Sequence, residues 1–160
     1  MAANAPTDLT LERKSPICNS PEDAIITLTN KATFPIVAVD LDAVAYTERK
    51  GPGKDSISGS VSRPLFHKEV TVLSLKESID ISIWDLAKQT VALCINDAPE
   101  FPQLRITVRF RHGITHAAKM IRRTYRPVFL PSGDLELQEV INRFSESIPA
   151  LMSEFASHIS

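Results

Sequence analysis

The most prominent group of chemically active side chains is a run of cations with no acid among them. No acidic residue lies between Glu100 and Asp134, and seven of the eighteen Lys and Arg residues fall in that interval. Residues 1–100 carry ten basic and fourteen acidic side chains, and residues 134–160 carry one and five. Positive charge gathered in one segment of a near-neutral chain predicts a cationic surface that attracts phosphate, lipid headgroups or an acidic partner.

The spacing of these cations predicts the elements that carry them. Apolar and polar residues alternate over 104–111, which predicts a strand with its arginines on one outward face. A helix is predicted over 115–125, with Thr115 as its N-cap and Pro127 beyond its end, and the other cations share one side of it. Together the two elements predict one cationic surface, made by Arg105, Arg109, Arg111, Lys119, Arg122, Arg123 and Arg126.

A second group of cations lies in the polar segment 47–64. This segment contains three glycines, which predicts a mobile loop. Its tip carries Arg49, Lys50 and Lys54. We expect this tip to make a further contact with the same anionic partner.

The cations leave three interpretations open. They can bind an anionic ligand, pair with the chain's own acidic flanks, or pair with the acids of a second copy and drive self-association. We predict a non-enzymatic structural or assembly protein that forms homo-oligomers and binds nucleic acid or membrane headgroups through the cationic surface, without a cofactor. Layer-forming proteins of the viral matrix type are similar in having one domain and one basic face. An adaptor that binds an acidic protein through the same residues is an alternative.

Two carboxylates at alternate positions suggest a different chemistry. The apolar run Phe34–Val39 leads into Asp40 and Asp42, which resembles the first motif of the haloacid dehalogenase-like phosphatases. The resemblance implies that Asp40 attacks the phosphoryl group and that Asp42 acts as acid and base beside a Mg²⁺ ion. Asp134, which follows another apolar run, resembles the late acidic motif of that family. A Mg²⁺-dependent phosphatase is therefore the enzymatic alternative.

The histidines and cysteines form no further site in the sequence pattern. His112 and His116 have the four-residue spacing of metal ligands on a helix, but Gly113 lies between them and no Cys or acid follows nearby. Cys18 lies in a polar stretch and Cys94 in an apolar run, so both are expected to be unpaired thiols, with Cys94 in the core. We therefore predict neither a metal site nor a disulfide.

Length and composition are those of one globular domain. The chain has 160 residues, 43% of them hydrophobic and 23% charged, which is enough for a sizeable core. Residues 1–22 contain three prolines and little apolar periodicity, which predicts an N-terminal tail or surface strap before a single domain over 23–160. The chain has no signal-peptide pattern and no long apolar run, which predicts an intracellular protein, soluble or peripherally membrane-associated, that is not secreted.

The apolar pattern as a whole predicts a mixed fold. Alternation predicts four strands, over 24–30, 34–46, 65–73 and 104–111. The stretch 77–94 fits both a helix and alternating strands, and the capping pattern Ser74–Glu77 favours the helix. A kinked or double helix is predicted from Asp134 onward. The predicted fold is α+β, with an antiparallel sheet of four to five strands and helices concentrated in the C-terminal half, and the alternative is a β-sandwich with C-terminal helices.

Overall fold

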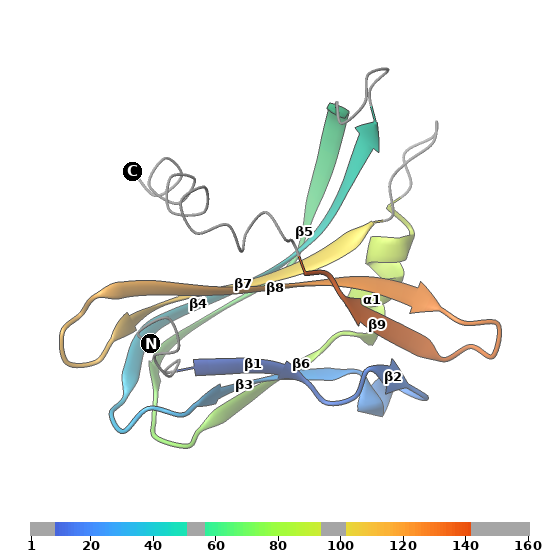
Figure 1. Cartoon of the computed structure of the whole chain (residues 1–160). Coiled ribbons are helices and arrows are strands. Elements are labelled where there is room, and N and C mark those ends of the chain that lie inside the picture. The colour runs from blue at the N-terminus through green and yellow to red at the C-terminus, as the bar shows by residue number, and fades with distance from the viewer. Residues whose placement is uncertain (1–8, 51–56, 94–101, 142–160) are drawn as a thin grey trace.

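The described chain folds into two antiparallel sheets (Figure 1). The computed structural model describes residues 9–50, 57–93 and 102–141, and of 48–50, 57 and 58 only the main chain. The smaller sheet contains, in spatial order, β1 (Leu9–Arg13), β3 (Ile25–Asn30) and β6 (Ser78–Ser82). The larger sheet contains, in spatial order, β2 (Ile17–Cys18), β9 (Leu135–Glu139), β8 (Ala118–Phe129), β7 (Gln103–His112), β4 (Ile36–Lys50) and β5 (Ile57–Leu73).

The core lies between the two sheets. Alternate residues of the smaller sheet point toward the larger one and are buried, as Leu28 and Ile81 are. The central strands of the larger sheet contribute buried side chains such as Leu41 and Ile106. Because side chains alternate along a strand, the remaining residues of these central strands point away from the core. One face of the larger sheet is therefore an outer face.

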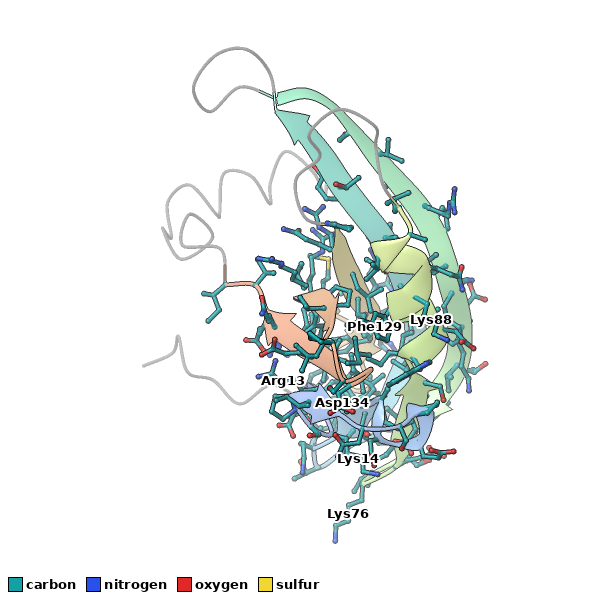
Figure 2. All side chains as sticks on the ribbon, turned by 90° about the vertical axis from the view of Figure 1, so that its right-hand side faces the viewer. Arg13, Lys14, Lys76, Lys88, Phe129 and Asp134 are labelled. Carbon is teal, nitrogen blue, oxygen red and sulfur yellow. The ribbon has the colours of Figure 1, made fainter. Side chains whose placement is uncertain are left out.

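The helix α1 (Trp84–Val91) packs against the core side of the larger sheet, and a short 3₁₀ helix (Pro21–Asp23) links β2 to β3. α1 contacts β4, β7 and β8, and its Leu86 and Ala87 are buried. Its Trp84 packs edge-on against Phe129, with ring centroids 5.4 Å apart. Figure 2 shows Phe129 among the side chains beside the helix. The helix thus adds apolar side chains to the sandwich that the sheets form.

The β4–β5 hairpin extends beyond the rest of the larger sheet. Tyr46 is the last residue of β4 that pairs with β7, opposite Gln103. Pairing of β4 with β5 continues as far as Lys50 and Ile57, so the two strands form an arm (Figure 1). The segment 47–64, predicted as a loop, is therefore strand on both sides of residues 51–56, which lie outside the described residues.

Asn30, the last residue of β3, connects the two sheets through its buried side-chain amide. Its Nδ2 donates to the main-chain oxygen of Leu73 in β5 at 2.9 Å and to that of Phe34 at 3.2 Å. Its Oδ1 accepts a hydrogen bond from the main-chain nitrogen of Ala32 at 2.8 Å. The amide thus satisfies main-chain groups where the chain passes from the smaller sheet to the larger one.

Gly113 packs directly against the main chain of Pro35. A Cβ atom at position 113 would overlap the carbonyl of Pro35, whereas a Cβ at Gly59 would meet no atom within 4 Å. We expect Gly113→Ala to lower the free energy of unfolding by about 2 kcal/mol, because the β7–β8 turn or Pro35 must move. Chemical denaturation measures the change, and Gly59→Ala is the matched control, with an expected effect below about 0.5 kcal/mol. Equal effects of the two substitutions would contradict this packing.

The predicted fold class is wrong, because the described chain is mostly strand and only strands follow α1 in it. The segment predicted as a helix over 115–125 lies largely in β8, and the helix predicted from Asp134 gives way to β9. The alternative prediction, a β-sandwich with C-terminal helices, is also wrong in its helices, because residues 118–141 contain none. β8 pairs with β7 on one side and β9 on the other, and this pairing outweighs the local helix preference of its Ala, Lys and Arg residues. Residues 142–160 lie outside the described part.

Two other predicted segments also differ from the structure. The helix predicted over 77–94 is half correct, since β6 occupies 78–82 and α1 occupies 84–91. The capping pattern closes a turn instead, in which the main-chain nitrogen of Ser74 donates to Oε1 of Glu77 at 2.7 Å. Within the predicted N-terminal tail, residues 9–18 include β1 and β2, and Cys18 is fully buried.

Candidate anion-binding groove

The outer face of the larger sheet brings three arginines together. Arg105 and Arg109 lie on β7, and Arg122 lies on β8 directly opposite Thr107. Directly opposed residues of antiparallel strands point to the same face, so the register puts all three arginines on one side. The alternate residues of β7, such as Ile106, are buried on the other side. The sequence prediction of a strand with outward arginines is confirmed for β7.

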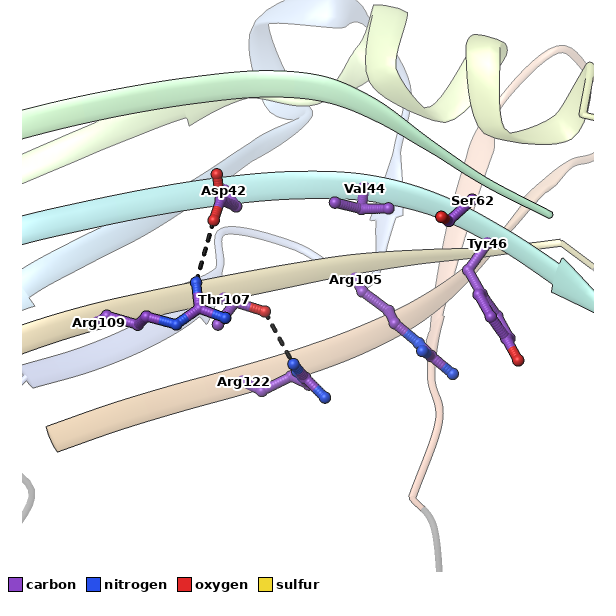
Figure 3. A pocket seen from close by; sticks show the side chains of 8 residues that line it. All are labelled: Asp42, Val44, Tyr46, Ser62, Arg105, Thr107, Arg109 and Arg122. Carbon is purple, nitrogen blue, oxygen red and sulfur yellow. Dashed lines mark hydrogen bonds and ion pairs between the residues drawn. The ribbon is translucent and has the colours of Figure 1, made fainter. Parts of the chain in front are cut away.

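These three arginines line an open groove of about 260 Å³ (Figure 3). β4 contributes Asp42, Val44 and Tyr46, and β5 contributes Ser62. Thr107 lies deepest in the groove, since only 6% of it is exposed. Four neighbouring strands of the larger sheet therefore build the groove, and only the tertiary structure brings them together.

Each arginine is held by a different neighbour. Arg109 Nη1 donates to Oδ2 of Asp42 at 3.1 Å, and Arg122 Nε donates to Oγ1 of Thr107 at 3.2 Å. The guanidinium carbon of Arg105 lies 3.7 Å from the centroid of the Tyr46 ring, within the range of a cation–π interaction. Figure 3 shows the three guanidinium groups along the groove. The hydrogen-bonding atoms that these contacts do not use can bind a ligand.

Within the part of the chain that the structure describes, Asp42 is the one acid that lines the groove, and it does not balance the charge of the three arginines. Asp42 pairs with Arg109, whereas Arg105 and Arg122 contact no carboxylate among the described residues. Burial, followed by the charges of Arg105 and Arg109, lowers the pKa of Arg122 below its ordinary value. Loss of water and the proximity of like charges both disfavour a cation, and an anion in the groove counters both effects. The groove is thus suited electrostatically to an anion.

A second group of titratable side chains lies beside the groove, on β4 and β5. The register sets Asp40 opposite Glu69 and Asp42 opposite His67. Nε2 of His67 lies 2.8 Å from Oδ1 of Asp40, 3.8 Å from Oε1 of Glu69 and 4.0 Å from Oδ1 of Asp42. The hydrogen bond to Asp40 is the main cause that raises the pKa of His67 above its ordinary value, and the charges of the three carboxylates add to it. Acids and cations therefore occupy neighbouring parts of one face.

Two of the predicted cations lie on the other side of β8. Lys119 and Arg123 are opposite Phe110 and Ile106, whose side chains are buried in the core. A helix would have placed them close to Arg122, whereas the alternation of a strand separates them from it. The predicted helical stripe of cations is therefore wrong.

The remaining predicted cations lie outside the groove or outside the described side chains. Arg111 lies farther along β7, where its Nη1 donates to a main-chain oxygen of the β7–β8 turn at 3.0 Å. Arg126 lies four residues beyond Arg122 on β8, on the same face. Arg49 and Lys50 belong to the β4 arm, and their side chains are not described. Lys54 lies in the segment 51–56, outside the described residues.

Asp40 and Asp42 do not have the setting that the phosphatase resemblance implies. Both lie in the middle of an antiparallel strand, and Asp42 is paired with Arg109. Asp134, the late acid of the resemblance, lies in the turn between β8 and β9. Across the sheet, Asp40 is in line with Met120 of β8. The strand continues for nine residues beyond Met120 before the turn, so Asp134 lies roughly 30 Å from Asp40. The fold does not bring the three carboxylates together.

The other reactive side chains named from the sequence have structural contacts. Nδ1 of His112 accepts hydrogen bonds from the main-chain nitrogens of Ile114 and Thr115, both at 3.1 Å, and so shapes the β7–β8 turn. Cys18 is buried, and burial is the main cause that raises the pKa of its thiol. A buried thiol with a raised pKa is a poor nucleophile. Cys94 lies outside the described residues.

Four groove residues were missed in the sequence, namely Val44, Tyr46, Ser62 and Thr107. The signal for them was present in part, because Asp42, Val44 and Tyr46 share one parity on a predicted strand. The pattern of one strand does not reveal which strands lie beside it. The pairing of β4 with β7 was therefore not predictable from the sequence of β4. The groove became visible only with the register of the sheet.

Among the residues that the structure describes, no helix combines the length and apolar character needed to cross a bilayer. No protein-family model matches the chain, and no curated protein is significantly similar to it. The residues and geometry of the groove are therefore the basis on which a function can be assigned.

Proposed function

We propose that the protein is a non-catalytic assembly protein that binds a phosphate-bearing partner through the groove. The observation that supports this proposal most directly is the convergence of Arg105, Arg109 and Arg122 on one outer face with a single paired acid. Guanidinium groups bind phosphate oxygens through paired, charge-assisted hydrogen bonds. The three guanidinium groups repel one another, and a bound phosphate would offset that repulsion.

The neighbouring acids favour a compact phosphate group over a continuous anionic layer. Asp40, Asp42 and Glu69 lie on the same face as the arginines. A flat anionic layer spread over this face would meet these carboxylates as well as the cations, and the like charges would repel. A single phosphate group, carried on a headgroup or on a nucleic-acid backbone, can enter the groove and contact mainly the arginines. We therefore propose that the protein recognises a single phosphate group instead of the extended anionic surface predicted from the sequence.

Self-association remains a prediction, and β5 is the element that could support it. β5 is a 17-residue strand at one edge of the larger sheet. The main-chain groups along the free edge of such a strand can pair with a strand of a second copy. Size-exclusion chromatography with light scattering at low and high salt would reveal an oligomer and any electrostatic contribution to it.

Neutralising two groove cations tests the proposal. We expect Arg105→Gln with Arg122→Gln to weaken the binding of pyrophosphate about tenfold or more, because each arginine contributes a charge-assisted contact. Isothermal titration calorimetry measures the affinity. Vesicles containing phosphatidylserine and a short single-stranded RNA then identify the source of the phosphate, and an acidic peptide without phosphate tests the adaptor alternative.

The matched control removes two cations from the other side of β8. Lys119→Gln with Arg123→Gln changes the net charge by the same amount but leaves the groove intact. We expect this pair to change the affinity by less than about twofold. If both pairs weaken binding equally, general charge attraction explains the binding and the groove does not.

A further inference from the structure

The hairpin of β4 and β5 presents a group of metal-ligand side chains beside the groove. Asp40, His67 and Glu69 come from two adjacent strands, and their donor atoms all lie within 4.8 Å of one another. The group differs from a set of acids alone, because an imidazole nitrogen lies among the carboxylate oxygens. Nitrogen and oxygen donors together are the ligand set of many zinc and manganese sites.

The distances are close to those that one ion requires. A divalent transition-metal ion takes such ligands at about 2.0–2.2 Å, so two donors of the same ion lie at most about 4.4 Å apart. Nε2 of His67 is 2.8 Å from Oδ1 of Asp40 and 3.8 Å from Oε1 of Glu69, both within that limit. The side chain of Glu69 is 74% exposed, so it is free to rotate toward the other two ligands. A small rotation of the Glu69 side chain would bring its carboxylate close enough to Asp40 and His67 for all three to bind one ion.

The charges around the imidazole also favour a cation. Asp40 and Glu69 are directly opposed on neighbouring strands, where like charges repel. Asp42 also lies near His67, but Arg109 already neutralises it through a 3.1 Å ion pair. A dication between Asp40 and Glu69 would replace their repulsion with two attractive contacts.

We propose that Asp40, His67 and Glu69 bind a divalent transition-metal ion of the Zn²⁺ or Mn²⁺ type, with water in the remaining positions. The imidazole favours these ions over Mg²⁺, which prefers oxygen ligands. The ligand set differs from the Mg²⁺ site implied by the phosphatase resemblance, since it uses His67 and Glu69 and leaves Asp42 to Arg109. The proposal does not depend on the groove, because none of the three ligands is a groove residue.

Direct metal titration of the full chain tests this site. After treatment with EDTA and desalting, ZnCl₂ is titrated into the protein by calorimetry, and MnCl₂ is titrated while paramagnetic broadening of amide signals is followed by NMR. We expect one saturable site, with broadening centred on β4 and β5. His67→Gln should weaken Zn²⁺ binding at least about tenfold, because a ligand is lost.

Two further variants make the result specific. Glu69→Gln should also weaken the binding at least about tenfold, and its exposed position means that it leaves folding intact. The control is His116→Asn, which removes an exposed histidine from the β7–β8 turn. Asparagine tolerates the positive φ of 61° at this position, so the fold is kept and the affinity for Zn²⁺ should stay within about twofold. The proposal is overturned if no saturable binding occurs up to ~1 mM of either ion, or if both ligand variants lose less than tenfold.

Discussion

Replacing Asn30 with Ala should lower the free energy of unfolding by about 3 kcal/mol, because its buried amide satisfies several main-chain groups. The side chain is only 1% exposed, and its amide makes hydrogen bonds to main-chain groups of the segments that join the two sheets. Truncation removes the side-chain partner of the buried oxygen of Leu73 and of the partly buried nitrogen of Ala32. Urea denaturation followed by circular dichroism measures the loss.

The control for this prediction is Asn19→Ala, because Asn19 is exposed. We expect its effect to stay within about 0.5 kcal/mol. A loss below about 1 kcal/mol for Asn30→Ala would mean that the freed main-chain groups find new partners, and that this amide does not connect the sheets energetically. The measured slope against urea concentration should be the same for both variants, since the fold is unchanged.

The second large effect is expected when two groove charges are reversed. Arg105→Glu with Arg122→Glu should weaken the binding of a phosphate-bearing ligand by about a hundredfold or more, since two attractive contacts become repulsive. In the native protein the affinity for RNA or vesicles should fall as salt rises, by roughly one log–log unit for each phosphate neutralised. The reversed variant should lose this salt dependence. Fluorescence anisotropy of a labelled RNA, measured over a salt series, gives both quantities.

Reversal on the other side of β8 provides the comparison. Lys119→Glu with Arg123→Glu produces the same change of net charge, but neither residue lines the groove. We expect this variant to keep most of the affinity and nearly the same salt slope. Similar losses in the two variants would indicate that binding follows net charge rather than the arrangement of the three arginines.

The strand carrying Arg105 and Arg109 could be predicted because its pattern is local. Leu104, Ile106 and Val108 alternate with polar residues, and this alternation persists whatever the neighbouring strands are. β8 could not be predicted in the same way. Its sequence has good helix formers and a plausible cap, and its strand conformation depends on hydrogen bonds to β7 and β9, which are distant contacts.

The candidate site was predictable to a similar extent. The sequence identified the arginines of β7 and the carboxylates Asp40 and Asp42, but it treated them as separate features with unrelated chemistry. In the structure β4 lies next to β7, so Asp42 pairs with Arg109 and Tyr46 packs on Arg105. These contacts join residues about sixty positions apart, and no local pattern encodes such a pairing.

The sequence by itself determined that seven of the eighteen cations lie in one acid-free segment and that those of β7 share an outward face. Both properties follow from composition and from the two-residue period of a strand. Only the tertiary structure decided which cations meet. Arg122 joined Arg105 and Arg109 because β8 pairs with β7 as a strand, and the same pairing turned Lys119 and Arg123 to the other side. Strand pairing is settled by hydrogen bonds and burial across the whole sheet, so the face on which a side chain lies is a tertiary property.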